Sequence, residues 1–263
     1  MACLRCYGKV SNSDFANAKF QRDDIDMNFE DIRKVTGILL DYLPNTLKLF
    51  AWTLALSIPV GMIVTMLKKC RFKPVAWLTN LYILIMRGTP LMLQIIAIYY
   101  AVPMLKASSA KNGSDGIFMN IVNAIDTRAD NYMFTALLVA FVLNYAAYFA
   151  EIFRGGIEAI PKGQYEAASM LGMTKMQTFF RIILPQVTKR VIPATSNEVI
   201  VLVKDTSLAN VIAFAEITMK AKQQMNTYSS IMPLFIAGAF YFVLNAIVTV
   251  VFYFIEKKFD YYK

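Results

Sequence analysis

Five long apolar stretches, separated by shorter polar segments, dominate the pattern of the chain. Each has about 20 residues or more, the length that an α-helix needs to cross roughly 30 Å of hydrocarbon. The pattern therefore predicts an all-α membrane protein with five transmembrane helices in one domain, which we place at residues 46–259. We expect the spans at about 47–67, 77–105, 133–153, 191–214 and 231–255.

Two of the spans are interrupted. Pro59 and Gly61 lie inside the first span, where we expect a bend. The second span is too long for a straight crossing, and the sequence RGTP predicts a break inside it. A break at lipid depth must satisfy the backbone groups that it frees. We therefore expect Arg87, Gly88 and Pro90 to form this break, with the Arg87 side chain bonding the freed carbonyls.

The segments outside the spans differ in character. Residues 1–26 are polar throughout, so we expect a disordered leader without a signal peptide, and Met27 is an alternative start. Residues 27–45 are amphipathic and are expected to lie along the outer membrane interface. The polar loop 106–131 is expected outside, and residues 260–263 form a short tail.

The link at residues 154–190 is mixed and basic, and its local signals predict a helix–turn–helix. Residues 162–171 are expected to form a short helix, which Gly172 ends with a left-handed cap. The sequence TKMQ at 174–177 has the spacing of a capping box. It starts a second helix that we expect to end at Pro185.

Composition and charge distribution also favour a membrane protein, and they predict its orientation. The chain has 57% apolar and aromatic residues and a formal net charge of +9. Lys and Arg gather in 68–73, in the link and at the C-terminus, whereas acidic residues balance them in 106–131 and 215–230. Basic loops tend to stay in the cytoplasm, so we expect the N-terminus outside and the C-terminus inside the cell membrane. Because this charge flanks the spans instead of covering one soluble surface, we expect no nucleic-acid partner.

The sequence offers few groups for catalysis. It has no histidine, and Cys3 and Cys6 form a lone C-x-x-C, which is weak evidence for zinc or redox chemistry. It also lacks the phosphate-binding pattern G-x-x-x-x-G-K-S/T. We therefore expect no catalytic residue, no metal and no cofactor on this chain.

Ionisable residues inside the fourth span are the first candidates for a substrate site. Such residues cost about 2.5–3.5 kcal/mol each on insertion scales and are functional candidates by default. Glu198 and Asp205 are seven residues apart, so two helical turns place them on one face, about 10 Å apart along the axis. Thr206 and Ser207 follow with small hydroxyl groups, and Asn144 of the third span could line the same cavity.

These carboxylates leave several interpretations open. Two carboxylates that face one cavity favour a substrate with a second positive charge, such as arginine, lysine or ornithine. One carboxylate is enough for a single α-ammonium group, so glutamine or cystine stays open. Alternatively, Asp205 takes part in an ion pair with Arg87 or Lys204 that only holds helices together.

The link and three other stretches carry a specific family resemblance. The sequences RGTPLMLQ, NYAAYFAEIFRGGIEAIPKGQYEAA and LVKDTSLA are similar to those of permease subunits of ATP-binding-cassette (ABC) importers for polar amino acids. The resemblance extends from about residue 41 to residue 263, although the long 106–131 loop and the leader depart from it. The EAA signature of that family matches Glu166, Ala167, Ala168, Gly172, Ile182, Leu184 and Pro185.

The resemblance implies a fold and a set of partners. The fold is that of type I ABC importer permeases, which is MetI-like, and the chain would work as a homodimer or as a heterodimer with a similar permease. Glu166, Ala167, Ala168 and Gly172 would dock onto separate ABC ATPase subunits, which bind ATP and magnesium. An extracytoplasmic solute-binding protein would deliver a polar amino acid.

The implied function is ATP-driven import of a polar amino acid of the cationic arginine or lysine type, with glutamine or cystine as further candidates. In similar permeases, positions like Asn144, Glu198 and Asp205 face the central pathway. The alternative is an ion-coupled secondary amino acid transporter in which Glu198 and Asp205 carry protons or sodium. A membrane scaffold or receptor that transports nothing is a further alternative.

Overall fold

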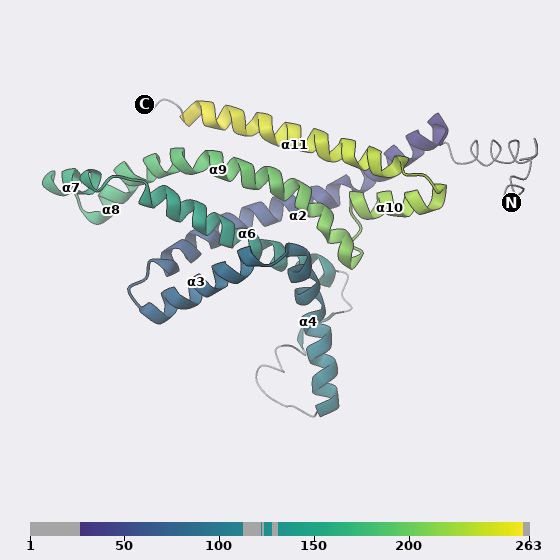
Figure 1. Cartoon of the computed structure of the whole chain (residues 1–263), viewed down its shortest axis with the longest axis horizontal. Coiled ribbons are helices and arrows are strands. Elements are labelled where there is room, and N and C mark those ends of the chain that lie inside the picture. Colours follow the sequence, from purple (N-terminus) through teal and green to yellow (C-terminus); the bar gives the residue numbers. More distant parts are fainter. Residues whose placement is uncertain (1–26, 113–121, 123, 128–130, 260–263) are drawn as a thin grey trace, which may run out of the picture.

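The computed structural model describes residues 27–112, 122, 124–127 and 131–259, and every regular element in these ranges is helical. Figure 1 shows an elongated bundle in which α2, α6, α9 and α11 run along its length, while α4 diverges from it. The expected leader, the tail and most of the outer loop lie outside the described residues. The elements are α2 (Phe29–Lys68), α3 (Lys73–Gly88), α4 (Leu91–Asn112), α6 (Tyr132–Glu158), α7 (Lys162–Met170), α8 (Lys175–Thr178), a π-helical turn (Phe179–Ile183), α9 (Leu184–Asp205), a 3₁₀ turn (Thr206–Ile212), α10 (Ile217–Tyr228) and α11 (Met232–Phe259).

Four of the described helices are long and apolar enough to cross a membrane: α2, α6, α11 and the Leu91–Ser109 part of α4. The all-α membrane fold that the sequence predicts is therefore confirmed. The predicted fourth span coincides with α9 and the 3₁₀ turn after it, and it is not among these four. Charged side chains along α9 lower its mean hydropathy, so a crossing by this segment stays a prediction.

The first helix, α2, has 40 residues and continues through Pro44 and Pro59 without interruption. At 1.5 Å per residue it extends about 60 Å, roughly twice the hydrocarbon thickness. The amphipathic segment expected at the membrane interface is the first half of this same helix. Its apolar stripe, which includes Val35 and Leu39, is buried against α10 and α11. The amphipathic pattern therefore arises because this half of α2 packs against protein.

Helix α6 lies at the centre of the bundle and contacts α2, α3, α4 and α9. Gly61 of α2 approaches it so closely that a Cβ atom there would lie 2.8 Å from Phe149 Cβ. In the same contact, the Thr65 hydroxyl donates to the Ala150 carbonyl at 3.1 Å. Gly61 thus permits close packing of two helices, where the sequence analysis expected a bend.

The predicted helix–turn–helix of the link is present as α7 and α8. After α7, Gly172 adopts the left-handed conformation, with a φ angle of 69°. Gly172 N–H donates to the Ser169 carbonyl at 3.0 Å, and Met173 N–H donates to the Ala168 carbonyl at 3.1 Å. This pair of bonds is the Schellman arrangement, which satisfies the last carbonyls of a helix. The local signals around Gly172 therefore predicted the turn correctly.

A capping box starts the second helix of the link. The Thr174 hydroxyl accepts from Gln177 N–H, and the Gln177 side chain accepts from Thr174 N–H. The prediction that this helix ends at Pro185 is wrong, because α8, the π-helical turn and α9 follow one another without a break. The π-helical turn ends at Ile183, two residues before Pro185, and it includes Arg181, whose carbonyl a proline four residues later cannot bond. The link is thus continuous with the helix that carries the predicted carboxylates.

A buried carboxylate organises the segment between α9 and α11. Glu216 is fully buried and caps α10 by accepting from the N–H groups of Thr218 and Met219 at 2.7 and 2.8 Å. The hydroxyl of Tyr241 in α11 donates to the same carboxylate at 2.9 Å. No helix was expected at residues 217–228, because their mixed composition lacks a strong apolar stripe.

Candidate functional site

The C-terminal end of α9 brings a carboxylate against the central helix of the bundle. Asp205 is the last residue of α9, and the hydroxyl of Tyr145 in α6 donates to its Oδ2 atom at 2.7 Å. Tyr145 is 2% exposed, and its ring packs with those of Phe141 and Phe149. Asp205 itself is half-buried. A hydroxyl group on a firmly packed ring therefore fixes the position of this carboxylate.

Glu198 lies seven residues before Asp205 on the same helix and is also half-buried. Neither carboxylate forms an ion pair with any residue that the structure describes. The structural pairing with Arg87 or Lys204 that the sequence left open is therefore not formed, and Asp205 has a hydroxyl partner instead.

The two hydroxyl residues after Asp205 have partners in their own segment. Thr206 is fully buried and donates its hydroxyl to the Val203 carbonyl at 2.7 Å. Ser207 is half-buried, and its backbone carbonyl accepts from the Asn210 side chain. Thr206 thus stabilises the junction between α9 and the 3₁₀ turn, and its side chain is closed to a substrate in this conformation.

Asn144 takes part in a hydrogen-bond network at the break between α3 and α4. Its Nδ2 atom donates to the Met86 carbonyl and to Gln94 Oε1, both at 3.0 Å. Gln94 donates in turn to the carbonyls of Met86 and Thr89 at 3.0 and 3.2 Å. The chain breaks at Thr89 and Pro90, and these amides satisfy the carbonyls that the break frees. In this conformation Asn144, which was expected to bind substrate, has a structural role.

The structure corrects the role expected for Arg87. Its guanidinium group lies over the ring of Tyr148, 5.2 Å from the ring centroid, and its Nη1 atom is 3.9 Å from Glu151 Oε2. The freed carbonyls are bonded by the two amides instead of by this guanidinium group. The amides of Asn144 in α6 and Gln94 in α4 reach these carbonyls directly, whereas the Arg87 side chain contacts Tyr148 and Glu151 and is 44% exposed.

Glu151 is the centre of an ion-pair cluster near the end of α6. Lys68 Nζ lies 2.5 Å from its Oε1 atom, and Arg154 donates to Oε2 from Nε and Nη2 at 3.0 and 2.8 Å. Arg154 also donates to Glu158 at 2.5 Å. Together with Arg87, these residues tie α2, α3 and α6 together beside the link.

The link presents an exposed apolar surface around its EAA signature. Glu166 and Ala167 are exposed, whereas Ala168 is buried at 1%. Exposed apolar groups of this kind are typical of surfaces that interact with another protein or with a membrane. The exposed apolar side chains around the turn are Met170 (91%), Leu171 (78%), Met176 (66%) and Phe180 (55%).

The sequence analysis did not identify Tyr145 or Gln94 as site residues. Both lie inside the family-like stretches, at NYAAY and RGTPLMLQ, next to residues that were singled out. A tyrosine in an apolar span fits simple packing, so only the contact of α6 with α9 gives its hydroxyl a role. For Gln94, a polar side chain close to a predicted helix break was the signal that could have pointed to its role in bonding the freed carbonyls.

The helical architecture and these sites define an integral-membrane transport subunit. The family described as "Binding-protein-dependent transport system inner membrane component" matches residues 57–261, and the chain belongs to this family. Its curated relatives include the "Arginine transport system permease protein ArtQ" of Bacillus subtilis (strain 168), which is 34% identical over 84% of this chain and 91% of the relative. The "L-cystine transport system permease protein TcyB" of the same organism is 33% identical over 87% of each chain.

Solved structures agree with this assignment. The "Crystal structure of an amino acid ABC transporter with histidines" contains a chain that is 31% identical, with a TM-score of 0.72 over 89% of this chain and 99% of that one. A chain of the MetNI methionine ABC transporter has 14% identity and a TM-score of 0.62 over 84% of this chain and 96% of that one, which shows the shared fold. The chain is therefore an ABC permease of the polar amino acid type with the MetI-like fold that the sequence predicts.

Proposed function

We propose that this chain forms the translocation path for a cationic amino acid of the arginine or lysine type in an ATP-driven importer. The observation that carries the proposal is the pair of half-buried carboxylates on α9, Glu198 and Asp205, which form no ion pair with the described residues. They lie two helical turns apart, about 10 Å along the axis. A substrate with two separated positive groups can bind both of them.

The choice between a cationic and a neutral substrate depends mainly on Glu198. Asp205 already accepts a hydrogen bond from Tyr145, and a single carboxylate of this kind suits any α-ammonium group. A second carboxylate is needed only for a second positive charge. The relatives named for arginine and for cystine support a polar amino acid without deciding between the two classes.

Coupling to the ATPase follows from the connections of α6 and α9. Helix α6 leads into the link, and α9 leads out of it through the π-helical turn, so the two partners Tyr145 and Asp205 are attached to opposite ends of the link. Helix α9 is about 33 Å long and connects the end of the link to Asp205 over this distance. The exposed turn and Glu166 dock onto an ATPase subunit, which binds ATP and magnesium, and closure of that subunit moves both helices.

The arrangement of the basic segments supports an orientation with the N-terminus outside. In Figure 1, the connection between α2 and α3, the pair α7 and α8, and the C-terminal end of α11 all lie at one end of the bundle, while α10 lies at the other. The first three are the basic segments, which favour the cytoplasm. A solute-binding protein delivers substrate at the opposite end, and two permeases, identical or similar, enclose the path.

Uptake by the complete assembly in liposomes tests the substrate class. Labelled arginine, glutamine and cystine are compared for the wild type and for Glu198→Gln. We expect the wild type to prefer arginine and the variant to need at least a tenfold higher arginine concentration for half-maximal uptake, since truncating one side of a desolvated charge pair costs about 2 kcal/mol or more. The exposed neighbour supplies the control Asn197→Ser, which should leave uptake unchanged. Arginine uptake that is unaffected in Glu198→Gln, or a wild-type preference for glutamine or cystine, contradicts the cationic assignment.

A further inference from the structure

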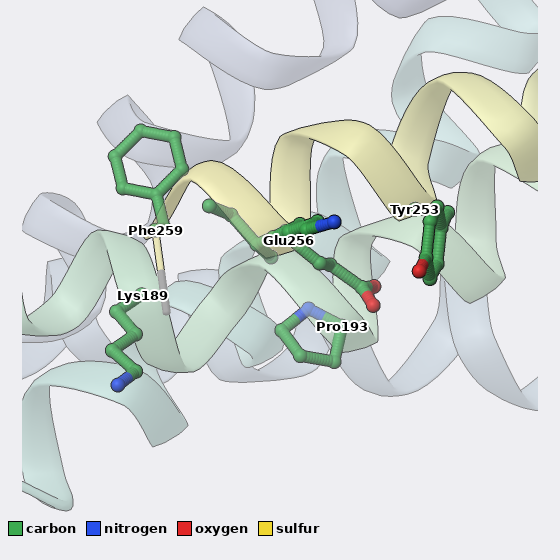
Figure 2. A pocket seen from close by; sticks show the side chains of 7 residues that line it. Lys189, Pro193, Tyr253, Glu256 and Phe259 are labelled. Carbon is green, nitrogen blue, oxygen red and sulfur yellow. The ribbon is translucent and has the colours of Figure 1, made fainter. Parts of the chain in front are cut away.

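A groove with several cationic side chains lies between the first turns of α9, α7 and the C-terminal end of α11, and Figure 2 shows its part beside α11. Two adjoining cavities of about 500 and 650 Å³ form it, and Lys189 and Pro193 line both of them. The cavity beside α11 is also lined by Ile192, Tyr253, Glu256, Lys257 and Phe259. The cavity beside α7 is also lined by Gln164, Arg181, Ile182, Pro185, Gln186 and Arg190. We call the two together the basic groove.

Among the described residues that line it, the basic groove has more positive than negative side chains. Its lining includes four cationic side chains, of Arg181, Lys189, Arg190 and Lys257, and one acidic side chain, of Glu256. Arg181, Arg190 and Lys257 are exposed and form no ion pair with the part of the chain that the structure describes. Such a cluster attracts an anionic group.

The groove places these cations beside the end of a helix that is long and apolar enough to cross a membrane. Helix α11 is one of the four helices that can cross a membrane, and Lys257 and Phe259 lie in its last turn. Tyr253, one turn earlier, is 59% exposed, and tyrosine is enriched at the depth of lipid headgroups. Figure 2 shows Tyr253 and Phe259 at either side of the cavity, with Lys189 and Pro193 of α9 below them.

We propose that the basic groove binds an anionic phospholipid, with the headgroup phosphate at the arginine and lysine side chains and an acyl chain along the apolar wall. Basic pockets between membrane-spanning helices bind such headgroups in other proteins. A protein partner fits this place less well, because the strongly exposed apolar side chains lie around the turn between α7 and α8 and are not part of the lining of the groove. The bound lipid joins α9 to α11 beside the link, so it stabilises the helix through which the link moves.

Native mass spectrometry of the full chain in detergent tests the proposal. Dioleoyl phosphatidylglycerol, which is anionic, and dioleoyl phosphatidylcholine, which is zwitterionic, serve as probes. We expect preferential binding of the anionic lipid, and about fivefold weaker binding for each arginine charge removed, or about 25-fold for Arg181→Gln with Arg190→Gln. Replacing both arginines by lysine should keep most of the affinity. Lys222→Gln, on α10 at the other end of the bundle, is the matched control and should bind like the wild type.

Three outcomes overturn the proposal. The first is equal binding of the two lipids, and the second is unchanged binding by the double arginine variant. The third is loss of the bound lipid when the ATPase partner is assembled with the permease, because the groove is then a protein interface. If the double variant does not fold, Lys257→Gln alone decides the question, with an expected fivefold loss.

Discussion

Among single residues, Tyr145 and Asp205 form a contact that joins the helix entering the link to the helix leaving it. Within the described residues, the Tyr145 hydroxyl donates a hydrogen bond to the Asp205 side chain, and the ring that carries it is almost completely buried. A hydrogen bond to a charged group contributes about 1.5–3 kcal/mol. The position of Asp205 therefore depends on α6 as much as on α9.

Replacing Tyr145 by phenylalanine removes this hydrogen bond and keeps the packed ring. We expect the arginine concentration for half-maximal uptake to rise about tenfold, because Asp205 loses the group that fixes its position. Tyr148→Phe, one turn later on α6, is the control and should resemble the wild type. Tyr145→Phe with unchanged uptake would show that the hydrogen bond has no part in substrate binding.

At the scale of elements, the contact between α2 and α6 depends on the absence of a side chain at Gly61. A methyl group there would lie 2.8 Å from Phe149 Cβ and 3.1 Å from the Ala146 carbonyl, so the two helices would have to separate. We expect Gly61→Ala to lower stability by about 1–3 kcal/mol, the usual cost of overpacking. Thermal unfolding in detergent measures the effect.

The same helix provides a matched control for this prediction. Gly37 lies in α2 as well, and a Cβ atom there has no neighbour within 4 Å. Gly37→Ala should therefore leave the unfolding temperature unchanged or raise it slightly, since alanine favours a helix more than glycine does. Equal losses for both variants would mean that helix propensity, and not the contact with α6, explains the effect.

Local sequence signals predicted the two helices and the turn of the link, whereas features that depend on tertiary contacts could not be predicted. The capping box at Thr174 and the left-handed turn at Gly172 depend on neighbouring residues only, so both were visible in the sequence. The continuation of the helix through Pro185 after the π-helical turn was not visible in the sequence, because proline normally ends a helix.

Less of the candidate site could be predicted from the sequence, because most of its contacts join residues that are far apart in the chain. Charged residues stand out in an apolar span, so the sequence was enough to single out Glu198 and Asp205 as candidate site residues. The functions of Asn144 and Arg87 depend on which helix lies beside the break between α3 and α4, and a periodicity argument contains no such information. The partner of Asp205 likewise became visible only once α6 and α9 were in contact.

At the scale of the whole molecule, we propose that the ATPase partner docks on the exposed apolar surface around the EAA signature, at the turn between α7 and α8. Glu166 is exposed on α7, next to the apolar side chains around the turn. Glu166→Lys should reduce the stimulation of ATP hydrolysis by substrate-loaded binding protein at least tenfold, because it places a repelling charge where a partner cation is expected. Lys162→Gln, in the first turn of the same helix, is the control. Normal stimulation in Glu166→Lys would locate the docking surface elsewhere.

We propose that this chain moves an amino acid at the expense of ATP bound by a partner. The most direct test measures labelled arginine uptake into liposomes that contain the permease with its ATPase and binding protein, with and without ATP and with an ionophore that abolishes ion gradients. We predict that uptake requires ATP and persists with the ionophore. Uptake that continues without ATP and stops when the ion gradients collapse would contradict the account and favour an ion-coupled transporter that uses Glu198 and Asp205.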